Sequence, residues 1–219
     1  MPFTGIPPEA IEFYVRLDAD NSKVFWEANK ATYRDVVKVS IQSLCDELAE
    51  FGPFHLFRPY NDVRFAKGKP PYKTQQGAYG ESEGGAGHYL HISPTGLMVA
   101  TGYYAMARDQ LERFRAAVDA EHTGAEIAAI VGGLQKKYRI GAIDELTTAP
   151  KGFPKDHPRI DLLRRKGLMM SAELGTPAWL NTKQVPAKIR AVWKAAAPMN
   201  SWLDAHVGPS TLEPEGFFR

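Results

Sequence analysis

His88-Tyr-Leu-His-Ile-Ser-Pro-Thr-Gly-Leu-Met-Val-Ala-Thr-Gly-Tyr-Tyr104 is the stretch that decides the fold. Its residues alternate between two faces, as in a β-strand. Pro94-Thr95-Gly96 puts Pro and Gly where a β-turn favours them. We therefore predict a hairpin with strands 88–93 and 97–104. One face is expected to carry His88, Leu90, Ile92, Leu97, Val99, Thr101 and Tyr103, the other Tyr89, His91, Met98, Ala100, Gly102 and Tyr104, and both faces are expected to be half-buried.

Helical periodicity dominates the sequence on both sides of this hairpin. The longest helix is predicted over 24–50, with Asp20 or Asn21 as its N-cap. Short strands are predicted at 63–65 and 168–174, and the five glycines within 77–87 predict a mobile loop. Other helices are expected from Pro8, over 107–121, after 123, over 160–166, over 185–196 and from Pro198. The whole pattern predicts a single α+β domain over 1–219, with an antiparallel hairpin-based sheet packed by several helices.

Composition places the chain among ordinary globular proteins. It has 219 residues, 44% of them hydrophobic and 24% charged, which excludes a wholly disordered chain. One cysteine, Cys45, excludes an intrachain disulfide framework and a thiolate zinc cluster. Its place on an apolar helical stripe predicts a small buried side chain. The sequence shows neither a secretory signal nor a long apolar run, so we expect a cytoplasmic protein without a membrane partner.

Positive charge is concentrated in three segments although the net charge is only +2. Residues 58–73 hold five cations against Asp62, residues 151–166 hold six against two acids, and residues 183–194 hold four against none. If the three segments converge in space, they form a basic face for an anionic partner. If they do not, each is an ordinary solvated surface.

The densest of the three, 58–73, interleaves cations with tyrosines. Such side chains donate hydrogen bonds to phosphate or carboxylate oxygens, and loops on a rigid scaffold often carry binding residues. We predict that cations of this segment hold an anion and that Tyr72 orients it. The four cations are Arg64, Lys67, Lys69 and Lys73.

Two histidines invite a metal interpretation, but His88 and His91 point to opposite faces of one strand. They cannot share an ion without a bulge, so no metal site is predicted, and no cofactor is implied. His91 and Asp62 are the acid–base candidates. Further ligand contacts are expected from Tyr104, His157 and Arg164.

Four motifs together resemble an uncharacterised domain-of-unknown-function family, widespread in bacteria and present in fungi. They are Trp26-Glu-Ala-Asn29-Lys30-x-x-Tyr33, the stretch from Arg58 to Thr74 with its Arg64-Phe-x-Lys-x-Lys-x-Pro-Tyr-Lys73 core, Tyr89-Leu-His-Ile-Ser-Pro94, and Pro150-Lys-Gly-Phe-x-Lys-Asp-His-Pro158. Ala66 and Gly68 stand where that family usually shows Ser and Asp, so no role of those two side chains carries over. The resemblance implies no reaction.

These observations predict a small-molecule-binding protein or enzyme with a basic pocket for a phosphate- or carboxylate-bearing ligand. The alternative is a nucleic-acid-binding or protein-interaction module without catalytic activity, because basic loops with aromatic residues also track a nucleic-acid backbone.

Overall fold

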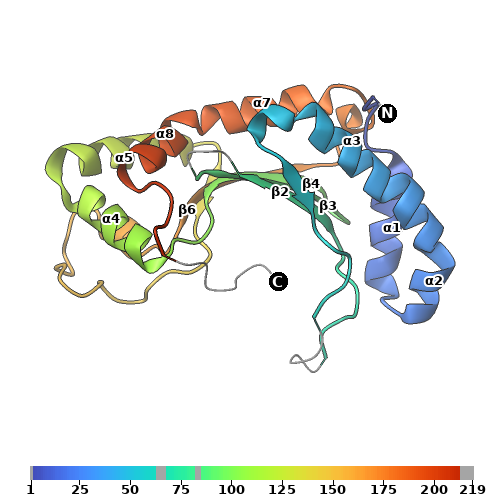
Figure 1. The fold of residues 1–219 in the computed structure, drawn as a ribbon, viewed down its shortest axis with the longest axis horizontal. Helices are drawn as coiled ribbons and strands as arrows, with labels where there is room; N and C mark the ends of the chain where they lie inside the picture. Colours follow the sequence, from blue (N-terminus) through green and yellow to red (C-terminus); the bar gives the residue numbers. More distant parts are fainter. Residues whose placement is uncertain (1, 63–67, 82–84, 213–219) are drawn as a thin grey trace. The chain divides into compact units, whose positions relative to one another are not determined.

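The computed structural model describes residues 2–62, 68–81 and 85–212 (Figure 1). Its strands form one antiparallel sheet in the order β1-β2-β3-β4-β6-β5. The predicted α+β class is confirmed, and so is the hairpin, which is β3 and β4. The strands are β1 Phe54–Leu56, β2 Gln76–Glu81, β3 Gly87–Ser93, β4 Gly96–Tyr103, β5 Arg139–Gly141 and β6 Leu168–Gly175.

The helices precede, interrupt and follow these strands. They are α1 Pro8–Ala19, α2 Lys23–Thr32, η1 Tyr33–Lys38, α3 Val39–Glu47, η2 Ala49–Phe51, α4 Arg108–Asp119, α5 Glu121–Leu134, α6 Ile160–Leu163, η3 Ala178–Asn181, α7 Val185–Ala195 and α8 Ala197–His206. Within the described part of the chain, none of them is long and apolar enough to cross a membrane.

The fold gathers into two compact units, and neither is a continuous stretch of chain. Unit 1 comprises Met1–Glu81, His88–Val99 and Glu173–Val192, and unit 2 comprises Ser82–Gly87, Ala100–Ala172 and Trp193–Arg219. The boundaries between the two units fall at the end of β2, after the first residue of β3, and inside β4, β6 and α7.

In unit 1 the predicted 24–50 helix is a helical run of three parts, because the π-helical η1 separates α2 from α3. Its N-cap is Ser22, whose hydroxyl accepts a hydrogen bond from the Phe25 amide at 3.1 Å. The expected caps Asp20 and Asn21 were wrong, because Asn21 instead bonds the backbone of Tyr72.

The two faces of the hairpin in unit 1 differ in burial. Leu90, Ile92, Leu97 and Val99 are fully buried on the face along which α3 and α7 lie in Figure 1. On the opposite face Tyr89, His91 and Met98 are half-buried. The expectation that both faces are half-buried was therefore wrong for the helix-covered face.

The glycine-rich stretch corrects a second expectation, because its first part is strand β2. A Cβ at Gly77 would lie 2.9 Å from Tyr89 Oη, and one at Gly80 would lie 3.0 Å from the Phe54 ring. These glycines therefore make room for aromatic rings on neighbouring strands, which is a packing role for glycine within a sheet.

In unit 2 helices α4, α5 and α8 pack together around Phe114, Ile127 and Trp202. Trp202 Nε1 donates to the Thr123 carbonyl at 3.1 Å, and Asn200 donates to Thr101 Oγ1 at 2.8 Å. These bonds fix α8 to α5 and to the end of β4.

Candidate functional site

The densest group of predicted site residues lies on a two-armed ribbon in unit 1. Residues 57–61 and 71–77 run antiparallel beyond β1 and β2 (Figure 1). Backbone bonds join Phe57 N to Gly77 O at 2.9 Å and Lys73 N to Pro59 O at 2.7 Å. A β-bridge pairs Tyr60 with Tyr72. These backbone pairs hold the two arms of the ribbon together, so the side chains of the ribbon have defined directions.

Two contacts tie this ribbon to the helices. The side-chain amide of Asn21 donates to the Tyr72 carbonyl at 3.0 Å and accepts from the Tyr72 amide at 3.1 Å. The Tyr72 ring stacks on Trp26 with centroids 4.4 Å apart and only 6% of the residue exposed. Burial raises the pKa of the Tyr72 phenol. This packing gives Tyr72 a role in positioning the ribbon.

A cluster of like charges lies on the ribbon. Lys73 is half-buried, with its Nζ 5.3 Å from the centre of the Phe57 ring. Burial, followed by the charges of Arg58 and Lys69, lowers the pKa of the Lys73 ammonium. The lowered pKa means that lost hydration and neighbouring positive charges disfavour the protonated form of Lys73, and that no nearby negative charge among the described residues offsets them fully. An anion placed beside Lys73 would supply that compensation.

The neighbouring strand contributes a chain of polar groups. Gln75 Nε2 donates to Tyr89 Oη at 3.0 Å, and Tyr89 Oη lies 3.0 Å from His91 Nδ1. Burial lowers the pKa of His91 to about 4, so its imidazole is neutral at pH 7. Because Tyr89 Oη accepts a hydrogen bond from Gln75, its own O–H is free to donate to His91 Nδ1. The ring proton of His91 is then on Nε2.

Phe57 joins these two groups, because its ring lies 6.1 Å from that of Tyr89. We call the surface formed by Phe57, Lys73, Gln75, Tyr89 and His91 the Tyr89 face. It combines the aromatic rings of Phe57 and Tyr89, the Lys73 ammonium with its incompletely compensated charge, and the neutral imidazole of His91. Phe57, Gln75 and Tyr89 were not among the predicted site residues. The period-2 spacing of Lys73, Gln75 and Gly77 is the sequence signal that could have placed Gln75 beside Lys73.

The other predicted residues of 58–73 divide into two groups. Arg64 and Lys67, together with the predicted strand 63–65, lie outside the described residues. Lys69 and Asp62 are described and exposed, and Asp62 takes part in interactions of its own. Lys69 acts on Lys73 through its charge.

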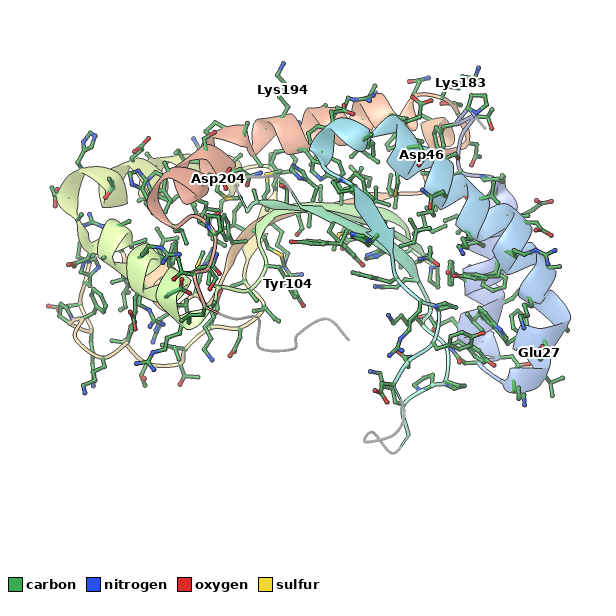
Figure 2. All side chains as sticks on the ribbon, viewed as in Figure 1. Glu27, Asp46, Tyr104, Lys183, Lys194 and Asp204 are labelled. Carbon is green, nitrogen blue, oxygen red and sulfur yellow. The ribbon has the colours of Figure 1, made fainter. Side chains whose placement is uncertain are left out.

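Three predicted residues belong to unit 2. Tyr104 follows β4 and exposes half of its surface (Figure 2). His157 is held by two partners: Nδ1 accepts from the Arg159 amide at 3.0 Å, and Nε2 lies 3.2 Å from Asp119 Oδ1. Arg164 donates to the Thr147 carbonyl. These three residues lie in a different unit from Lys73.

The basic segment 183–194 is mostly solvated. Lys183 and Lys194 are exposed and project away from their helical segment (Figure 2). Arg190 is compensated, because it pairs with Glu50 at 2.5 Å and donates to the Glu47 carbonyl. This segment therefore contributes solvent-facing charge.

Cysteine chemistry is absent from the Tyr89 face. Cys45 is buried on α3 as predicted, with 2% of the residue exposed, and burial raises its pKa to about 12. A thiol with that pKa supplies no thiolate near neutral pH. Among the residues that the structure describes, no three His, Cys, Asp or Glu side chains are grouped to hold a metal ion.

Comparison with known proteins adds one finding. A family model described as a conserved hypothetical protein (DUF2461) matches residues 9–202. The match spans both units and includes the whole Tyr89 face. No curated protein and no solved structure matches the chain.

Proposed function

The chain belongs to the conserved hypothetical protein family DUF2461, and from that premise we propose that it binds a small organic molecule carrying a phosphate or carboxylate group on the Tyr89 face. The anionic group of the ligand lies against Lys73 and Arg58. The body of the ligand lies on the rings of Phe57 and Tyr89.

The charge cluster supports the anionic end of this ligand. Lys73 is partly desolvated, and the charges of Arg58 and Lys69 repel it. A bound oxyanion removes this penalty and gains charge-assisted hydrogen bonds. Because the cation is half-buried, the interaction is screened less than at an open surface.

The imidazole supports recognition of a second polar group. His91 is neutral, and its ring orientation is set by Tyr89, whose phenol is held by Gln75. A neutral imidazole held this way donates its Nε2–H to a ligand oxygen. His91 therefore contributes a hydrogen-bond donor for a second polar group of the ligand.

One observation carries the proposal: Lys73 and the hydrogen-bonded Gln75–Tyr89–His91 chain both lie against the Phe57 ring, Lys73 through its Nζ at 5.3 Å and the chain through the Tyr89 ring at 6.1 Å. Convergent polar groups with perturbed pKa values are typical of binding sites.

A thermal-shift screen tests the proposal. Wild type, Lys73→Met and His91→Gln are heated with inorganic phosphate, sugar phosphates, nucleotides, small carboxylates and a short single-stranded oligonucleotide. A ligand at about 100 times its Kd adds about 2.7 kcal/mol, which raises Tm by roughly 5–10 °C for a chain of this size. We expect a small anion to produce this shift in wild type and to lose it in Lys73→Met.

Lys183→Met is the matched control, because Lys183 is an exposed lysine of the same unit. It should keep the full shift. Equal shifts in Lys73→Met and Lys183→Met would refute the proposed site. A shift only with the oligonucleotide, fading steeply as salt rises, would instead support the nucleic-acid alternative.

A further inference from the structure

A pocket lined by residues of unit 2 lies apart in sequence from the Tyr89 face, and we propose that it binds a small organic acid, an oxyanion on an apolar body. The pocket has a volume of about 340 Å³ and lies between α5 and the segment that contains α6. This volume is within the range of small-molecule sites. Arg164, Arg165 and Glu145 form its polar part, and Val131, Leu146 and Leu162 contribute apolar surface.

The central observation is a buried guanidinium with unused donors. Arg165 exposes only 9% of its surface, yet its Nε and Nη1 have no hydrogen-bond partner among the described residues. Nε of Arg164 is likewise buried without a partner in that part of the chain. Buried polar groups in folded proteins are nearly always paired, and the planar fork of arginine matches a carboxylate or phosphate.

The other charges that line the pocket leave room for such a ligand. Glu145 Oε1 lies 3.4 Å from Arg165 Nε without a good hydrogen bond, and the Glu145 side chain is 52% exposed. Because Nε and Nη1 of Arg165 are covered, an oxyanion reaches Nε only when the exposed Glu145 side chain moves away into water. Asp161 is exposed, and Arg159 is occupied because it donates to the Val118 and Asp119 carbonyls at the end of α4.

The apolar wall defines the rest of the ligand. Val131 and Leu162 are at least nine-tenths buried, and Leu146 is half-buried. A short aliphatic body fits beside the small part of these side chains that lines the pocket, and removing that part from water favours an organic acid over an inorganic ion. This site shares no residue with the Tyr89 face, so each proposal can fail without the other.

Two adjacent glycines of α5 allow a sharp test. A Cβ at either Gly132 or Gly133 would meet nothing within 4 Å, but only Gly132 lines the pocket. Leucine at either position should therefore be tolerated and should improve helix propensity equally. Gly132→Leu fills the pocket, and Gly133→Leu is its control.

The probe is hexanoate, titrated calorimetrically at constant ionic strength, with inorganic phosphate and hexanol as comparisons. We expect hexanoate to bind wild type and Gly133→Leu alike and to bind Gly132→Leu at least about tenfold more weakly, about 1.4 kcal/mol. Hexanol should bind more weakly than hexanoate because it has no oxyanion. Equal hexanoate affinity in both leucine variants would overturn the proposal.

Arg165→Lys provides the second measurement, because it keeps the charge and loses the planar fork. We expect hexanoate binding to fall while the far-UV circular dichroism of the variant stays native. Unchanged binding in a folded Arg165→Lys protein would overturn the assignment of Arg165. If Arg165→Lys does not fold, the two leucine variants decide the question alone.

Discussion

The lack of a Cβ atom at Gly77 leaves the space that the Tyr89 ring occupies. A Cβ at position 77 would lie 2.9 Å from Tyr89 Oη and 3.1 Å from Phe57 Cδ2. Gly77→Ala should therefore displace both rings and lower the free energy of unfolding by about 1–3 kcal/mol. Urea unfolding followed by circular dichroism measures this change.

Gly141→Ala is the control for Gly77→Ala. Gly141 also lies in a strand, but a Cβ there meets nothing within 4 Å, so its substitution should leave stability nearly unchanged. Gly77→Ala should also weaken binding of any ligand found on the Tyr89 face. Identical stability of the two variants would show that Tyr89 is not constrained by this contact.

The two strand histidines predict how stability depends on pH. Burial lowers the pKa of His88 and of His91 from 6.5 to about 4. Between these values the unfolded chain binds protons that the folded chain does not, so the free energy of unfolding falls as the pH falls. The free energy of unfolding keeps its full value above pH ~6.5 and decreases towards pH ~4. The decrease is on the order of 2–3 kcal/mol for each histidine.

Urea unfolding of wild type and His91→Gln at pH 7 and pH 5 measures this dependence. The difference between the two proteins isolates His91, because the other titrating groups, including Asp204 with its raised pKa, are common to both. Wild type should lose more stability than the variant between the two pH values. A parallel loss in both proteins would contradict the buried, neutral state of His91.

At the scale of elements, the ribbon depends on stacking between Tyr72 and Trp26. The rings are nearly parallel, at 9°, and the backbone of Tyr72 is held by Asn21. Tyr72→Phe keeps the stacking and should change stability by less than about 0.5 kcal/mol. Tyr72→Ala removes a buried ring and should cost about 3–5 kcal/mol.

Binding measurements on the same two variants separate packing from recognition. If Tyr72 only positions the ribbon, Tyr72→Phe binds the anion found in the screen as tightly as wild type does. A large loss of affinity in Tyr72→Phe, with stability intact, would instead assign the phenol to the ligand, as the sequence alone suggested.

The elements also show what a sequence can predict. Strands β3 and β4 were predictable because residues that alternate between two faces flank a Pro and Gly turn. Strand β2 was missed because its glycines signal a loop, although they serve neighbouring rings. Strands β1 and β5 have three residues each, too few to establish a period of two.

The same limit applies to the site. Lys73 and His91 were predictable from charge and residue type, but the packing of Phe57 between Lys73 and Tyr89 comes from pairing between strands distant in sequence. Gln75 and Phe57 carry no chemical signal of their own. Their place on the Tyr89 face follows only from the fold, since Gln75 reaches Tyr89 across strands and Phe57 packs beside it.

At the scale of the whole molecule, the prediction of a single domain becomes a prediction of cooperative unfolding. Boundaries between the two units fall within β4, β6 and α7, so neither unit can be excised as one fragment. Melting one unit would break continuous strands and a continuous helix. We therefore expect a single two-state transition in urea.

The four tryptophans report on the units separately, because Trp26 and Trp179 belong to unit 1 and Trp193 and Trp202 to unit 2. Trp26→Phe/Trp179→Phe leaves fluorescence from unit 2, and Trp193→Phe/Trp202→Phe leaves fluorescence from unit 1. In each variant, the fluorescence midpoint should coincide with the far-UV circular dichroism midpoint. Because both midpoints come from the same variant, a change in stability caused by the substitutions shifts them equally. Separate midpoints would mean that the units unfold independently. With coincident midpoints, a ligand bound to either unit must raise the stability of both, since a two-state transition transmits the binding free energy to the entire chain.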